Sequence, residues 1–130
     1  VFYQNLLAGK SGISSITEFP CEDYPTRFAG IIKNFEVGEY MDKKQARRVD
    51  KCIAYAMVAG KKALENAGLK AEQFDQSQKM RSGILIGSGM GGMSVFADGV
   101  QTLIEKGQRK VSPFFVPYIL TNMSGAVLGI

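Results

Sequence analysis

A short apolar run that leads through a glycine-rich loop into an amphipathic segment most restricts the fold of this chain. Residues 83–87 read Gly-Ile-Leu-Ile-Gly, a continuous apolar stretch typical of a strand buried on both faces. The loop Gly-Ser-Gly-Met-Gly-Gly follows at residues 87–92, and residues 94–106 carry apolar side chains at helical spacing up to a stop at Gly107. Strand, glycine loop and helix in this order predict an α/β protein.

A long helix is predicted upstream of this strand. Asp42 and Gln45 have the spacing of a capping box, and small or apolar side chains then recur at three- and four-residue steps up to Ala67, before Gly68. The pattern predicts one helix of about 25 residues. Its small side chains form a stripe that should pack closely against a sheet or another helix: Ala54, Ala56, Ala59, Gly60 and Ala63.

The other segments predict shorter elements. We expect a helix over residues 1–9, irregular strands over 13–19 and 26–35, a polar loop over 70–81, and a third helix over 118–128. The chain starts and stops in the middle of apolar patterns and has no initiator Met, which predicts a piece cut from a longer protein.

The composition excludes several kinds of active site. The 130 residues are 45% hydrophobic and 22% charged, which fits one globular domain, and no window is apolar enough to span a membrane. Because the chain has no histidine, it supplies no imidazole base and no histidine metal ligand. Its two cysteines, Cys21 and Cys52, lie far apart, which excludes a thiolate zinc cluster and a disulfide scaffold. No metal or cofactor is predicted, and if the chain belongs to an enzyme, we expect part of the active site to lie outside it.

The glycine loop has two functional interpretations. The spacing Gly87-x-Gly89-x-x-Gly92 matches a dinucleotide-binding fingerprint, but no acidic residue for a ribose follows about 20 residues later. A loop without Cβ atoms also lets the backbone approach a substrate chain or a neighbouring strand closely. Met90, its one bulky side chain, would then form an adaptable apolar wall or fill a gap in the core.

Basic side chains fall into two groups, one at the start of the long helix and one in a turn after the second helix. The net charge of +4 permits an acidic partner, although such runs are often only a solvated helix face. No aromatic residues are interleaved with the charges, which argues against nucleic acid. Cys52 beside the apolar stripe is interpreted as a small core residue, and Cys21 has no base to activate it.

Several short stretches form a distinctive combination: residues 6–13 (LLAGKSGI), 47–50 (RRVD), 59–65 (AGKKALE), 87–92 (GSGMGG), 112–117 (SPFFVP) and 121–123 (TNM). Taken together and in this order, they resemble the β-ketoacyl-[acyl-carrier-protein] synthases, the condensing enzymes of fatty-acid synthesis. The resemblance runs along essentially the whole chain, and residues 104–107 with the glycine loop are most similar to the plastid type-one enzymes of plants.

The resemblance implies a thiolase-like fold, with two similar α/β halves in a five-layered αβαβα arrangement, and a homodimer. Residues 1–130 would be a partial N-terminal domain that lacks the first strand and the region of the catalytic Cys. The two catalytic His would also lie outside, so no catalytic residue is assigned and the piece alone should be inactive. The implied partners are acyl carrier protein and acyl and malonyl thioesters, without nucleic acid or membrane, in the plastid stroma after loss of a transit peptide.

Two groups of auxiliary residues are implied by the resemblance. Met90 and Phe115 correspond to the acyl pocket, and Lys44, Arg47, Arg48, Arg109 and Lys110 to the basic docking surface for the acidic carrier protein. If the fold brings the two basic groups to one rim, they present adjacent cations to the carrier. A non-catalytic partner of the chain-length-factor type and a nucleotide-binding module remain as alternatives.

Overall fold

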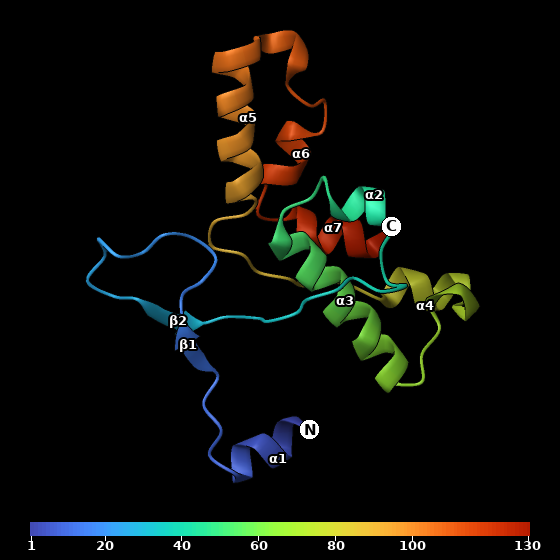
Figure 1. Ribbon diagram of the computed structural model, residues 1–130. Coiled ribbons are helices and arrows are strands. Elements are labelled where there is room, and N and C mark those ends of the chain that lie inside the picture. The colour runs from blue at the N-terminus through green and yellow to red at the C-terminus, as the bar shows by residue number, and fades with distance from the viewer. The chain divides into compact units, whose positions relative to one another are not determined.

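The computed structural model describes all residues from Val1 to Ile130 and divides them into two compact units, residues 1–36 and residues 37–130 (Figure 1). The first unit contains α1 (Phe2–Leu7) and an antiparallel pair of short strands, β1 (Ile13–Ser15) and β2 (Phe28–Gly30). Ile13 pairs with Gly30 and Ser15 with Phe28. The predicted first helix and both predicted strands are therefore present, although each strand is shorter than expected.

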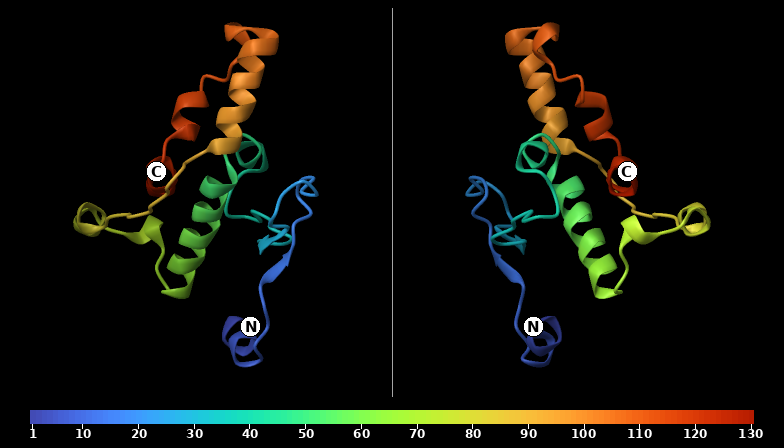
Figure 2. Two further views of the ribbon diagram at one scale, coloured as in Figure 1. Left: turned by 90° about the vertical axis from the view of Figure 1, so that its left-hand side faces the viewer. Right: turned by 90° about the vertical axis from the view of Figure 1, so that its right-hand side faces the viewer.

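The second unit is helical. It contains α2 (Lys43–Ala46), α3 (Lys51–Asn66), α4 (Gln76–Arg81), α5 (Met93–Lys106), α6 (Phe115–Ile119) and α7 (Met123–Gly129), with single 3₁₀ turns at Ala71–Gln73 and Gln108–Lys110. Helix α3 packs against α7. Helix α5 packs against α6 (Figure 2). The buried apolar side chains of this unit come from α3 and the segment before it: Met41, Val49, Ile53, Ala54, Met57 and Val58.

The predicted long helix is in fact two helices. Asp42 caps α2 as expected, because its Oδ1 accepts hydrogen bonds from the backbone N–H groups of Lys44 at 2.9 Å and Gln45 at 3.1 Å. The helix then ends, and Asp50, with an extended backbone, starts α3 as a second N-cap. An aspartate side chain that binds a nearby backbone N–H competes with helix continuation, which explains the break.

The small-residue stripe of α3 packs against a helix, as its pattern predicted. A Cβ atom added at Gly60 would collide with the side chain of Leu128 on α7. The absence of that Cβ therefore lets α3 and α7 approach closely at this point.

Two other predictions of secondary structure, the loop over 70–81 and the helix over 118–128, were wrong. Residues 70–81 are not a loop throughout, since α4 begins at a capping box in which Asp75 and Gln78 exchange hydrogen bonds of 2.7 and 2.9 Å. The third helix is divided into α6 and α7, because Leu120 adopts an extended backbone between them.

The predicted buried strand at residues 83–87 is absent, and β1 with β2 forms the one sheet of residues 1–130. Ile84 and Ile86 lie against the glycine positions of α7, whereas Leu85 is fully exposed. A strand needs a neighbour to pair its backbone N–H and C=O groups, and this segment has none. The molecule is thus helix-rich with few strands. None of its helices is both long enough and apolar enough to cross a bilayer.

Candidate functional site

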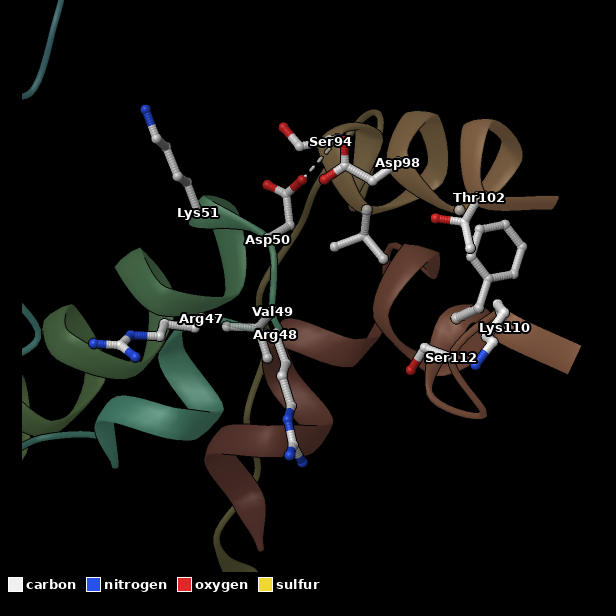
Figure 3. A pocket seen from close by; sticks show the side chains of 13 residues that line it. Arg47, Arg48, Val49, Asp50, Lys51, Ser94, Asp98, Thr102, Lys110 and Ser112 are labelled. Atoms are coloured by element: carbon white, nitrogen blue, oxygen red, sulfur yellow. Dashed lines mark hydrogen bonds between the residues drawn. The ribbon is translucent and has the colours of Figure 1, made fainter. Parts of the chain in front are cut away.

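A cavity of about 340 Å³ lies where the start of α3 faces α5 and the segment that follows α5 (Figure 3). Arg47, Arg48 and Lys110 all line it, although they belong to the two groups of cations that the sequence separates widely. The lining therefore includes three of the five residues that the sequence analysis assigns to carrier docking. Lys44 and Arg109 do not line the cavity.

The cations surround the cavity rather than converge on a point within it. In Figure 3, the Arg47 and Arg48 side chains extend in different directions from the turn before α3, and Lys110 lies on the other side. The carboxylates of Asp50 and Asp98 also line the cavity. Dispersed cations around a partly acidic centre suit an extended acidic surface better than a single small anion.

Asp50 joins the N-termini of two helices at the base of this cavity. Its Oδ1 accepts a hydrogen bond from the Cys52 N–H at 3.2 Å, and its Oδ2 accepts one from the Ser94 N–H of α5 at 2.9 Å. The residue is only 9% exposed. A carboxylate is favourable at both places, because the first turn of a helix leaves N–H groups unpaired and carries partial positive charge. The Asp50 cap is readable in the sequence, but its bond to Ser94 is not.

The glycine loop serves close packing of one backbone segment on another. Cβ atoms at Gly91 and Gly92 would collide with the carbonyl oxygens of Ile119 and Tyr118, and the Gly92 N–H donates to the Ile119 carbonyl at 3.3 Å. The close backbone approach is as predicted, but the neighbour is the end of α6 and not the expected strand or substrate chain. A nucleotide phosphate would need the free N–H groups at the start of α5, where Asp50 already accepts from Ser94.

Met90 and Phe115 occupy different surroundings. Met90 is 69% exposed, so it does not fill a gap in the core, and it does not line the cavity. Phe115 lines the cavity, stacks on Phe96 with ring centroids 6.1 Å apart, and covers Gly99, where a Cβ would meet its ring. Met90 and Phe115 therefore do not line a common cavity.

The surroundings of Cys52 disfavour its thiolate form. Burial raises the pKa of this thiol above its ordinary value, and the negative charge of Asp50 raises it further. The Cys52 Sγ donates to the Gly91 carbonyl at 3.5 Å. These surroundings suit a packing residue rather than a nucleophile. No group of three or more acidic or cysteine side chains in residues 1–130 is arranged to hold a metal ion.

Comparison with known proteins identifies a family and relatives whose names describe the same kind of enzyme. Residues 1–129 match the family described as β-ketoacyl synthase, N-terminal domain. The chain is 51% identical over 129 residues to 3-oxoacyl-[acyl-carrier-protein] synthase I, chloroplastic, of Arabidopsis thaliana, with 99% of this chain and 27% of the relative covered. It is 55% identical over 132 residues to the protein of that name from Hordeum vulgare, with 99% and 28% covered. The chain thus spans a little over a quarter of the length of these relatives.

A solved structure supports the same fold. A ketosynthase bound to the hexaketide, in complex with its type II PKS acyl-carrier protein, aligns with a TM-score of 0.65 and 24% identity, over 75% of this chain and 27% of that one. This neighbour supports a ketosynthase-like fold, and residues 1–130 contain mostly helices with one two-stranded sheet. The resemblance inferred from short motifs is confirmed by the family match over residues 1–129. The chain belongs to the β-ketoacyl synthase family and matches its N-terminal domain.

Proposed function

We propose that this chain is part of a 3-oxoacyl-[acyl-carrier-protein] synthase, which joins acyl and malonyl thioesters by decarboxylative Claisen condensation. The proposal is supported by 51–55% identity to two plant enzymes of that name. The chain contains no histidine, and its surroundings raise the pKa of Cys52, which supports placing the catalytic groups outside these 130 residues. The chain belongs to the N-terminal half of a thiolase-like αβαβα subunit, and two such subunits form a homodimer. Because both relatives are chloroplastic, the protein works in the plastid stroma.

Within that enzyme, this chain provides the docking surface for acyl carrier protein. We define the docking surface as Lys44, Arg47, Arg48, Arg109 and Lys110. The observation that carries the assignment is the shared cavity lining of Arg47, Arg48 and Lys110. Their dispersed cations complement an extended acidic partner, and such charges steer encounter and set orientation. The ketosynthase of similar fold was solved in complex with an acyl-carrier protein.

Met90 and Phe115 contribute to the acyl pocket, at separate places. Met90 presents a flexible apolar side chain from the glycine loop, and its exposure leaves it free to contact an acyl chain. Phe115 presents an aromatic ring that α5 supports through Phe96 and Gly99. The separation of the two residues agrees with Phe115 serving the pocket of the second subunit in the homodimer.

Charge reversal in the whole protein tests the docking assignment. The double variant Arg47→Glu/Lys110→Glu should raise the KM for carrier-bound substrate about tenfold or more, while kcat/KM on a minimal thioester without carrier changes less than about twofold. The wild-type KM should itself rise with salt, because exposed charges are screened beyond about 8 Å at physiological ionic strength. The double variant should lose most of that salt dependence.

A matched control separates the docking surface from net charge. Lys61→Glu/Lys79→Glu makes the same change of charge at exposed residues of α3 and α4 that do not line the cavity, and should leave the KM for the carrier nearly unchanged. Equal loss of activity on both substrates in Arg47→Glu/Lys110→Glu would refute the docking assignment. No condensation by the wild-type whole protein would favour the non-catalytic, chain-length-factor type of partner.

A further inference from the structure

The position of Asp50 conflicts with a purely electrostatic role in docking. Its carboxylate is negative and lines the same cavity as Arg47, Arg48 and Lys110. Its charge alone would weaken the attraction of an acidic carrier to that rim. A buried carboxylate is also costly unless its oxygens are hydrogen-bonded. The two bonds to backbone N–H groups offset that cost and indicate what the residue does.

Both bonds of Asp50 end on helices that adjoin the segments with the cations. Arg47 and Arg48 lie in the turn directly before α3, and the Cys52 bond anchors the first turn of α3 to that turn. The Ser94 bond anchors the first turn of α5, and Lys110 follows the far end of the same helix. Asp50 therefore forms a bridge between α3, which follows Arg47 and Arg48, and α5, which precedes Lys110.

Helix length amplifies any movement at this bridge. The 14 residues of α5 extend about 20 Å at 1.5 Å per residue. A rotation of about 10° at the start of such a helix displaces its far end by about 3.5 Å. That displacement exceeds the length of a hydrogen bond, so it would take Lys110 out of register with a partner that also contacts Arg47.

We propose that Asp50 is a positioning residue for the carrier protein: by bridging α3 and α5 it sets the spacing between Arg47 and Lys110. This inference rests on the docking function proposed above. It assigns Asp50 no contact with the carrier and no part in the chemical step. The sequence motif Arg-Arg-Val-Asp at residues 47–50 then contains two cations that bind the carrier and the carboxylate that orients them.

The variant Asp50→Ser, made in the whole protein, separates the bridge from the helix cap. Serine caps helices about as well as aspartate, so α3 keeps its N-cap, but one short hydroxyl cannot accept from both Cys52 and Ser94. We expect the KM for carrier-bound substrate to rise about fivefold, and kcat on a minimal thioester to change less than about twofold. The Ser94 amide should exchange its hydrogen faster than in the wild type. Asp50→Asn keeps the shape of the side chain but not its second acceptor oxygen. It should also raise the KM for carrier-bound substrate and speed exchange of the Ser94 amide.

Asp98→Asn is the matched control, because it also removes one negative charge from the cavity. Charge alone predicts that both Asp50→Ser and Asp98→Asn lower the KM for the carrier. The bridge predicts that Asp98→Asn lowers it and Asp50→Ser raises it. A lower KM in Asp50→Ser, or unchanged exchange of the Ser94 amide, would overturn the inference. If Arg47→Glu/Lys110→Glu leaves the KM for the carrier unchanged, the docking function itself fails, and the Ser94 amide still reports whether the bridge exists.

Discussion

Adding one methyl group at Gly92 should destabilise the fold more than adding it at Gly89 in the same glycine loop. A Cβ at Gly92 would collide with the Tyr118 carbonyl oxygen and lie 3.0 Å from its carbon and 3.2 Å from the Ile119 Cα. All three atoms belong to the backbone, so no side chain can rotate away to make room. Gly92→Ala must therefore separate the loop from the C-terminal end of α6.

The cost follows from the contacts. Overpacking by one methyl group in a packed region costs about 1–3 kcal/mol. The Gly92 N–H bond to Ile119, 3.3 Å long, would also be weakened, and it contributes about 0.5–1.5 kcal/mol. Alanine also lowers the conformational entropy of the unfolded chain, which offsets about 0.4–1 kcal/mol of this loss. The expected loss in free energy of unfolding is about 2 kcal/mol.

Urea unfolding of the whole protein, followed by near-ultraviolet circular dichroism, measures this loss. Gly89→Ala is the matched control in the same loop, since a Cβ there meets no atom within 4 Å and its φ is not left-handed. The control should unfold within about 0.5 kcal/mol of the wild type, or be slightly more stable. If the two alanine variants have the same urea midpoint, the collision at Gly92 does not limit the approach of the two segments.

Two further predictions concern reactivity and the isolated polypeptide. Because the Cys52 pKa is raised, iodoacetamide at pH 7.5 should modify Cys52 at least about tenfold more slowly in the folded protein than after denaturation, and equal rates would contradict the protected thiol. The raised pKa also contributes stability that is complete below the ordinary value of 9.0 and is lost as the pH rises through the folded value. The 130-residue polypeptide alone should bind a hydrophobic dye, melt broadly and form no ketoacyl product, because it lacks histidine and exposes apolar side chains such as Leu85 and Ile104. A sharp two-state melt or clear turnover would refute that expectation.

Features that depend on neighbouring residues were accessible from the sequence. The Asp42 cap and the stop at Gly107 involve atoms within a few positions of each other, so the residue types predict them. The short motifs also identified the family, since residues 87–92 and 112–117 read as a combination without knowledge of their contacts. The break at Asp50 and the capping box of α4 were readable on the same grounds but were outweighed by helical periodicity and by polar composition, respectively.

Features that join distant segments required the tertiary structure. The bond from Ser94 to Asp50 spans 44 positions, and the collision of Gly92 with Tyr118 depends on how the chain returns after α5. The strand predicted at residues 83–87 shows the same limit, because an apolar run becomes a strand only when a neighbouring strand pairs its backbone. The Arg47 and Lys110 side chains likewise share a cavity only because packing brings distant segments together. Local preferences specify each helix, whereas the packing of α5 on α6 and of α3 on α7 determines which residues the helices bring together.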